Sequence, residues 1–445
     1  MLEVSAAKEL RGKVTLPPSS DLFFLTCIAA LAGRVTLHVS PAIDTPESDT
    51  WRGLFEGRLS FERSDSGRRI TPSDETGIVP LGDCRIPWRE FAAFVCLGVG
   101  HTLQCAESCR VRVEWWKSLA ESAGCSLAIA EDNSNIRMHL ERAEEFRVPE
   151  DPLDGDMLYV FLGLAMGLRR SVKLILDTPF SSPLRPLLRD LGYEYSVRDL
   201  SVEKRDPMAR RIRRMKGKKG AEEPPRYELH IDFEKGPAES AEISLPGDET
   251  LCSVLIAAKS LIPRGGLVVQ GAPLEQWAMP ALELARRMGC KPGVQETGQS
   301  SFGAMGMIQL QTLDLTGRKT LCRPACHYAR HIPAMCTMAM FASGQSVFRG
   351  LEDLRRNSPD GVEELISCAA RIGARHGGMP DGLVIEGSLQ YDGFDLDVDR
   401  GAHVNGALAI AGLRCMGTTS VNDDSIRKRW PGFDETISSI CEYRR

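Results

Sequence analysis

One short pattern recurs six times along the 445-residue chain: an apolar helical end, a Gly or basic turn, a short β-branched strand and a polar stop. Most copies begin about 65–80 residues apart, and about 96 residues separate the third from the fourth. The copies occupy residues 29–41, 95–108, 163–179, 259–273, 339–353 and 412–425. A period of this length indicates a fold built from repeated supersecondary units.

A second element follows several of the copies: a helical pattern that ends in Gly and leads into another strand. Its members are LAESAGCSLAI, LLRDLGYEYSV, LARRMGCKPGV and CAARIGARHGG. In each of them the Gly stands where a helix C-cap requires a left-handed residue. Helical and strand periodicities therefore alternate within every unit. The pattern predicts an α/β protein with two similar lobes, each made of three βαβαββ units.

The long third gap marks the division between the predicted lobes. It contains the basic run KRDPMARRIRRMKGKK at 204–219, followed by GAEEPP, and we expect a solvated insertion at about 204–224 between two strands. A phosphate or RNA contact is the alternative, but no aromatic residues interleave the charges to stack on bases. We assign 16–242 to the first lobe, and 1–15 plus 243–445 to the second.

Composition narrows the possible partners and location. The formal net charge of −5 argues against a general nucleic-acid binder. The longest apolar run, 157–168, is far shorter than the ~20 residues that cross a bilayer. The first residues lack the apolar core of a secretory signal, and the 14 cysteines form no disulfide framework. We therefore expect a cytoplasmic monomer that contacts neither membrane nor nucleic acid.

Five strings resemble segments of the enolpyruvyl transferases, and within them most closely the EPSP synthases. In chain order these strings are RGKVTLPPSS, LGDCRIPWREFAAFVCLG, LPGDETLCSVLIAA, HIPAMCTMAMFASGQSVFRGLEDLR and KRWPGF. The resemblance implies an inside-out α/β barrel in each of two lobes, with helix N-termini that face an interlobe cleft. It also implies transfer of the enolpyruvyl group of phosphoenolpyruvate to shikimate-3-phosphate, without a cofactor or a metal. Such a site needs several Lys and Arg side chains for its anionic ligands.

In the first lobe, most positions that the resemblance marks as functional are substituted. The family's Lys-Ser pair reads Ser19-Ser20, and a nearby Arg is also lost. Asp83 replaces an Asn, and Arg85 replaces a Gly that lets a ligand approach closely. The family's Ser-Ser-Gln turn falls on 155–157, where all three positions differ. Arg89 matches a family Arg, and Arg110 matches another with a slip of one residue.

The second lobe shows the same loss. Arg330 stands at the position of the family's catalytic Asp, and Asp360 is the one match in a Lys-Glu-x-Asp-Arg string. His403 falls near a further Asp-His-Arg string, and Lys428 matches the family's terminal Lys. The alternative interpretation is that Arg89 and Asp360 serve packing and capping, and that Lys428 is solvated.

Two other sets of residues suggest different chemistry. The loop QCAESCRV resembles the Cys-containing loop of UDP-N-acetylglucosamine enolpyruvyl transferase, which would make Cys105 or Cys109 a reactive thiol. The string CRPACHYARH brings together potential zinc ligands, although two of them are adjacent and all four can hardly meet on one ion. These are Cys322, Cys326, His327 and His331. We expect the latter set to be neutral loop residues.

The substitutions lead to a functional prediction with two alternatives. Each lost charged contact to a transition state costs about 2–4 kcal/mol, so at least five losses nearly abolish ordinary activity unless other residues compensate. We expect an EPSP synthase-like protein that is catalytically impaired or diverged, with an anionic small molecule as partner if activity is retained. The alternatives are a non-catalytic homologue with a binding or regulatory role, and a protein of this fold that acts on another ligand.

Overall fold

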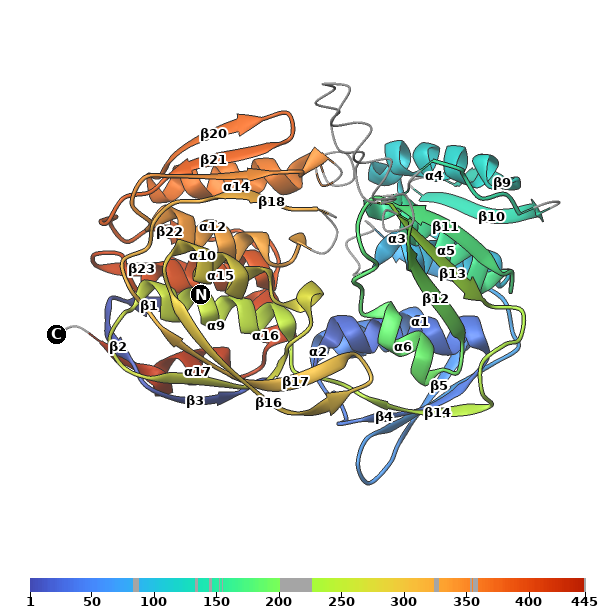
Figure 1. The fold of residues 1–445 in the computed structure, drawn as a ribbon, viewed down its shortest axis with the longest axis horizontal. Coiled ribbons are helices and arrows are strands. Elements are labelled where there is room, and N and C mark those ends of the chain that lie inside the picture. Colours follow the sequence, from blue (N-terminus) through green and yellow to red (C-terminus); the bar gives the residue numbers. More distant parts are fainter. Residues whose placement is uncertain are drawn as a thin grey trace, which may run out of the picture.

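The chain forms two α/β bodies that lie side by side (Figure 1). The computed structural model describes residues 1–445 except 83–87, 133–134, 144–145, 152, 154, 201–225, 324–327, 353, 355–358 and 444–445. Each body contains three small sheets that correspond to its three repeat units, and the second body also has a two-stranded sheet. The predicted fold class is therefore confirmed. The basic run at 204–219, with the whole insertion expected at 204–224, lies outside the described residues.

In the first lobe, two sheets have four strands and one has three. Each four-stranded sheet joins a parallel edge pair to an antiparallel hairpin, and the isolated parallel bridge Leu153↔Leu176 gives the third sheet the same pattern. The strand orders are β14 (Ser240–Ser244), β4 (Thr36–Ser40), β6 (Arg68–Pro72), β5 (Leu59–Arg63); β7 (Ile78–Gly82), β8 (Thr102–Ala106), β10 (Asn135–Ala143), β9 (Cys125–Asp132); and β11 (Val172–Leu176), β13 (Tyr227–Asp232), β12 (Glu194–Asp199).

The second lobe repeats this plan and uses the N-terminus to complete it. β3 pairs in parallel with β15, and β1 closes the sixth sheet against β23. The strand orders are β16 (Lys291–Ser300), β17 (Gly303–Gln311), β15 (Leu267–Pro273), β3 (Gly12–Thr15); β18 (Lys319–Leu321), β19 (Gln345–Arg349), β21 (Gly382–Glu386), β20 (Arg375–Met379); β1 (Leu2–Ser5), β23 (Thr418–Val421), β22 (Asp395–Leu396); and β2 (Ala7–Leu10), β24 (Cys441–Tyr443).

Three buried helices fill the centre of each lobe, and the sheets surround them. The central helices are α1 (Ser20–Gly33), α3 (Arg89–Gly98) and α5 (Gly155–Gly167) in the first lobe, and α9 (Glu249–Leu261), α12 (Ile332–Met340) and α15 (Ala402–Gly412) in the second. Every residue of α1, α9 and α12 is buried, as expected for a helix that is apolar on all sides. The outer helices are α2 (Pro46–Leu54), α4 (Arg110–Ser122), α6 (Leu184–Asp190), α10 (Pro280–Met288), α14 (Pro359–Ile372), α16 (Asp424–Arg429) and α17 (Phe433–Ile440).

The predicted glycine C-caps are present. Gly124, Gly192, Gly289 and Gly373 have φ values of 76°, 86°, 120° and 82° and follow α4, α6, α10 and α14. In this left-handed region glycine lacks the Cβ that would strain other residues. Local sequence therefore determines where these four helices end.

Two connections carry the chain between the lobes, one after β3 and one after β14. They run side by side: Ser19 N donates to Pro246 O at 3.0 Å, and Asp248 N donates to Pro17 O at 2.8 Å. β14 pairs with β4 as far as Ser244, two residues beyond the expected boundary at 242. Both connections lead directly into central helices, α1 and α9.

Helices α3 and α5 approach so closely that a Cβ at Gly163 would lie 2.7 Å from Phe91 O. We expect Gly163→Ala to cost about 1–3 kcal/mol, because the obstacle is backbone and cannot rotate away. That cost corresponds to a fall of about 2–10 °C in the melting midpoint of the first lobe, measured by calorimetry. Gly53→Ala in α2, where a Cβ would meet nothing within 4 Å, is the control and should not lower it. Equal midpoints for the two variants would show that the helices can separate without cost.

Candidate functional site

A charged group that is almost completely buried, the guanidinium of Arg429, lies where the two lobes meet beside the connections. The side chain is 1% exposed, and helix α16, which carries it, contacts α2 of the other lobe. We define the interlobe charge cluster as the ionisable residues around this guanidinium: Asp21, Glu47, Asp248, Glu249, Arg330, His403 and Arg429.

The carboxylates of this cluster come from the beginnings of three helices. Asp21 lies in the first turn of α1, Glu47 in that of α2, and Asp248 is the N-cap of α9. Acidic side chains are favoured there, because they interact with the free N–H groups and the positive end of the helix dipole. One Asp248 oxygen accepts from Leu251 N at 2.7 Å, which leaves the other oxygen free to bind Arg429.

Arg429 binds carboxylates from both lobes. Its Nη1 lies 2.7 Å from Asp21 Oδ1 and 3.2 Å from Glu47 Oε2, and its Nη2 lies 2.9 Å from Asp248 Oδ2. The Ser20 hydroxyl donates to the same Glu47 carboxylate. Arg330 adds a second cation, with its Nε 3.5 Å from Asp21 Oδ2.

Burial and charge act in opposite directions on these groups, and charge prevails for the paired ones. Burial disfavours the charged form of Arg429, but Asp21, Asp248 and Glu47 outweigh it and hold the pKa of the guanidinium well above its usual value. Burial would also raise the pKa of Asp21, but Arg330 and Arg429 lower it to about 2. Asp21 and Arg429 are therefore both charged at neutral pH.

Glu249 behaves in the opposite way. Burial, followed by the nearby Asp248 and Asp21, raises the pKa of its carboxyl to about 8, so the group is mostly protonated at neutral pH. The residue is 5% exposed, and its Oε2 has no hydrogen-bond partner. A protonated acid in this position can donate a hydrogen bond, which an ionised one cannot.

Two histidines complete the site on the side of the second lobe. Burial, together with Arg330 and Arg429, lowers the pKa of His403 to about 3, so this imidazole is neutral at physiological pH. The buried His331, N-cap of α12, has its Nδ1 2.8 Å from Ser253 Oγ of α9. With Glu249 and His403 neutral, three carboxylates face two guanidinium groups, which leaves one net negative charge at the cluster.

Comparison with known proteins shows which fold this chain has and which proteins its second half resembles. A family model described as EPSP synthase (3-phosphoshikimate 1-carboxyvinyltransferase) matches residues 222–437. The 3-phosphoshikimate 1-carboxyvinyltransferase of Brevibacillus brevis is 25% identical over 201 residues, which are 45% of this chain and 47% of that protein. The protein of the same name from Carboxydothermus hydrogenoformans is 23% identical over 202 residues, 45% of this chain and 47% of its own length. The match thus spans about half the length of these curated relatives.

Solved structures extend the likeness to the whole chain. An EPSP synthase from Acinetobacter baumannii has a TM-score of 0.69 at 13% identity and covers 100% of this chain and 99% of its own. The enolpyruvyl transferase NikO from Streptomyces tendae has a TM-score of 0.66 at 15% identity, with 99% and 97% covered. The chain has the fold of the enolpyruvyl transferases, and its second half is similar in sequence to the EPSP synthases. The resemblance expected over the whole chain is present in the fold, but the matched sequence is confined to about its second half.

Three of the nine residues predicted for an enolpyruvyl transferase site lie at the interlobe charge cluster. Ser19 caps α1 and bonds Glu249, Ser20 binds Glu47, and Arg330 approaches Asp21. Arg330 therefore lies at the junction of the lobes, and its role as a cation for a ligand stays a prediction.

The remaining predicted residues are elsewhere or outside the described residues. Arg89 pairs with Glu90, which also binds Arg112. Burial would raise the pKa of the Glu90 carboxyl, but the two arginines outweigh this effect and lower the pKa. Arg110 is exposed and pairs with Glu107 and Glu131. Lys428 is exposed, one residue before the buried Arg429. Asp360 belongs to the first turn of α14, whereas Asp83 and Arg85 lie outside the described residues.

The two cysteine-based alternatives gain no support from the geometry. Cys105 and Cys109 are both buried, so neither presents an accessible thiol. Of the four potential zinc ligands, Cys322 is buried, which raises the pKa of its thiol to about 12, and His331 binds Ser253. Cys326 and His327 lie outside the described residues. Within the described ranges no three His, Cys, Asp or Glu side chains are placed to hold a metal ion. Nor does any helix in these ranges have the length and apolarity needed to cross a membrane.

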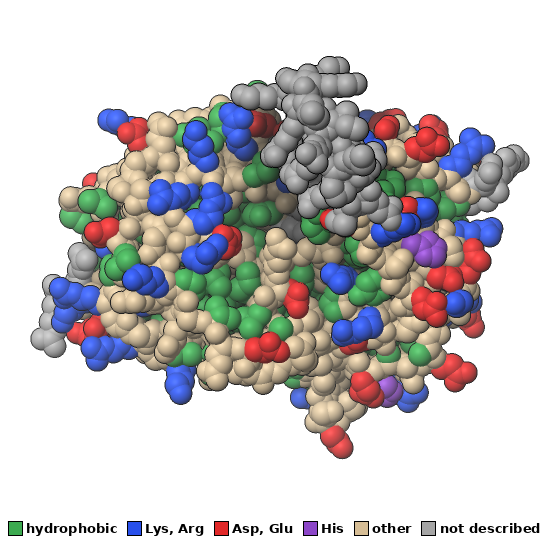
Figure 2. All heavy atoms as spheres, in the orientation of Figure 1, with side chains coloured by type: hydrophobic (Ala, Val, Ile, Leu, Met, Phe, Trp, Pro, Cys, Tyr) green, Lys and Arg blue, Asp and Glu red, His purple; other side chains and the backbone are tan. Residues whose placement is uncertain are grey.

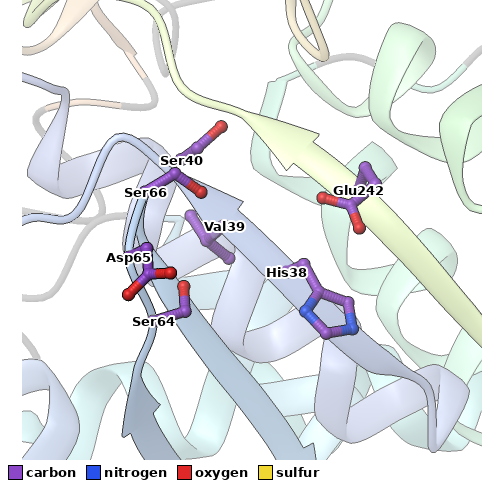
Figure 3. A pocket seen from close by; sticks show the side chains of 7 residues that line it. All are labelled: His38, Val39, Ser40, Ser64, Asp65, Ser66 and Glu242. Atoms are coloured by element: carbon purple, nitrogen blue, oxygen red, sulfur yellow. The ribbon is translucent and has the colours of Figure 1, made fainter.

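A polar pocket of about 260 Å³ lies at a sheet of the first lobe (Figure 3). Strand β4, strand β14 and the turn between β5 and β6 form it, and its lining residues are His38, Val39, Ser40, Ser64, Asp65, Ser66 and Glu242. No residue of the interlobe charge cluster lines this pocket, so it is distinct from the site at the lobe junction. Acidic and basic side chains are interspersed over the described surface in Figure 2, without a single basic face on that side.

Sequence reasoning missed Arg429, Asp21, Glu47, Asp248 and Glu249. For Arg429 a signal was present in the spacing of the residues. Ile426, Arg429 and Trp430, in and just after the short helix α16, are buried, whereas Lys428 is exposed. The acidic residues could have been noticed as helix N-cap and first-turn residues next to both connections. Nothing in the sequence indicated that three of these carboxylates would meet one arginine.

The raised pKa of Glu249 predicts a specific dependence of stability on pH. The unfolded chain releases the Glu249 proton near pH 4, whereas the folded protein keeps it up to about pH 8. Between these two pH values, Glu249 lowers the free energy of unfolding as the pH rises. Above about pH 8 this loss of stability does not increase further. Glu249→Gln should therefore raise the free energy of unfolding relative to the parent by roughly a few kcal/mol at pH 9. At pH 5 the difference should be much smaller.

Chemical denaturation at both pH values measures this effect. Glu56→Gln, at an exposed glutamate, is the matched control and should leave the pH profile unchanged. A profile of Glu249→Gln parallel to that of the parent would show that Glu249 is ionised in the folded protein.

Proposed function

We propose that this chain is an EPSP synthase-like protein whose interlobe site has diverged, so that transfer of an enolpyruvyl group from phosphoenolpyruvate to shikimate-3-phosphate is strongly impaired. The observation that carries the proposal is the environment of Arg429. Three carboxylates bind this guanidinium, which is therefore not available to an anionic ligand.

Electrostatic magnitudes support this proposal. Both substrates of the EPSP reaction are multiply anionic, whereas the cluster carries one net negative charge. At an effective dielectric constant of about 20, a unit charge about 6 Å from a like charge costs about 3 kcal/mol. The loss of each cationic contact to the transition state costs a further ~2–4 kcal/mol. Together these costs place ordinary turnover out of reach for the residues described.

A ligand of lower negative charge is the second candidate, and a specific observation favours it. Glu249 is neutral and its Oε2 is unpartnered, so it could donate a hydrogen bond to an uncharged acceptor. The likeness to NikO, another protein named as an enolpyruvyl transferase, is compatible with a different acceptor on this fold. A purely binding or regulatory homologue would instead show no turnover with any acceptor.

Phosphate release from shikimate-3-phosphate and phosphoenolpyruvate tests the proposal. We expect turnover at least ~10³-fold below that of the Brevibacillus brevis relative assayed in the same mixture, since more than one cationic contact is lost. Thermal shifts with each ligand should also be small, because neither finds a free arginine at the cluster. Turnover within tenfold of the relative would overturn the proposal, and Arg330→Gln would then test whether Arg330 supplies the missing cation.

A further inference from the structure

Few backbone hydrogen bonds join the two lobes where they meet: besides those of the connections, Ser301 N donates to Ser244 O of β14 at 3.0 Å. The two connections, 16–19 and 245–248, bond to each other through Ser19 N to Pro246 O and Asp248 N to Pro17 O. A single isolated bridge, Pro18↔Gly247, is assigned between them. Two short extended segments of this kind can act as a hinge, because a few backbone torsions absorb a domain rotation. Side chains must therefore fix the angle between the lobes.

Arg429 is placed to fix the angle between the lobes. The lobes contribute its partners separately: Asp21 and Glu47 belong to helices of the first lobe, whereas Asp248 and Arg429 itself belong to the second. We propose that Arg429 is an interlobe latch, which holds the two lobes together in the absence of any ligand by binding Asp21 and Glu47 across the junction. This inference does not rest on the proposed function.

The latch is held rigidly on its own lobe. Trp430, the next residue, is 2% exposed and lies against Gly406 of α15, where an added Cβ would come 2.7 Å from its ring. The guanidinium carbon of Arg429 lies 5.8 Å from the centre of the Trp430 ring. At the start of α16, Asp423 binds the N-terminal ammonium group at 3.0 Å. Arg429 therefore cannot follow the first lobe if the lobes separate.

The partners in the first lobe are positioned as firmly. Asp21 is 3% exposed in the first turn of the buried helix α1, and Glu47 accepts from Ser20 of the same helix. Rotation of the lobes would leave Asp21 and part of Arg429 as uncompensated charges. Breaking a buried pair by removing one partner is strongly destabilising for this reason. A closed junction is thus favoured in the absence of any ligand.

Variants that affect one side of the junction distinguish a latch from a general stabilising contact. Arg429→Met removes the bonds across the lobes, and the double variant Asp21→Asn with Glu47→Gln weakens them by removing both carboxylate charges. Asp248→Asn weakens a bond within the second lobe and retains a residue that caps α9 well. Arg427→Met is the matched control on α16, because Arg427 is exposed and pairs with Asp423 of its own lobe.

The radius of gyration from small-angle X-ray scattering of the ligand-free full chain is the deciding measurement. We expect Arg429→Met and the double variant to have a larger radius than the parent, and Asp248→Asn and Arg427→Met to keep the parent value. Amide exchange at 16–19 and 245–248 should become at least tenfold faster in the first two variants only. If Arg429→Met fails to fold, the double variant carries the test, since it leaves the Arg429–Asp248 bond in place. An unchanged radius and unchanged exchange in the folded variants would overturn the latch.

Discussion

A guanidinium that is almost completely withdrawn from water is the constraint on which the junction of this protein depends. Burying one charge without partners is prohibitively costly, so Arg429 requires carboxylates close by in fixed positions. Asp21, Glu47 and Asp248 meet that requirement at 2.7–3.2 Å. Each belongs to the beginning of a helix, and the geometry of the junction follows from bringing those three helix ends to one point.

The repeated unit explains why helix ends are available at this junction. Each lobe places three buried helices inside its sheets, and both interlobe connections lead straight into such a helix. Free N–H groups at helix N-termini suit anions, and in the enolpyruvyl transferases we expect those anions to be ligands. Here the carboxylates of the chain itself occupy this environment, at Asp21 and Asp248 above all. The same fold physics therefore favours a junction closed by ion pairs over one that awaits two anionic substrates.

How far the site could be predicted differs from residue to residue. Ser19, Ser20 and Arg330 were expected from the strings that resemble the family, and they lie at the cluster. Ser19 and Ser20 lie where the first connection enters α1, and Arg330 lies two residues before the central helix α12. Lys428 was expected, but its neighbour Arg429 is the buried residue, since the orientation of the six-residue helix α16 depends on how it packs against the rest of the lobe. In so short a helix, an error of one residue exchanges an exposed side chain for a buried one.

By itself, the sequence determined the elements of this protein. The sixfold pattern, the alternation of helix and strand, and the glycine C-caps depend on residues within one or two turns of each other, so local physics was sufficient to predict them. Only the tertiary structure decided the electrostatics. Asp21 and Arg429 are 408 residues apart, and the raised pKa of Glu249 exists only because folding places a buried carboxyl beside two others. The interaction between two charges depends on their distance in space and on the local dielectric constant. Neither quantity follows from the positions of the residues along the chain.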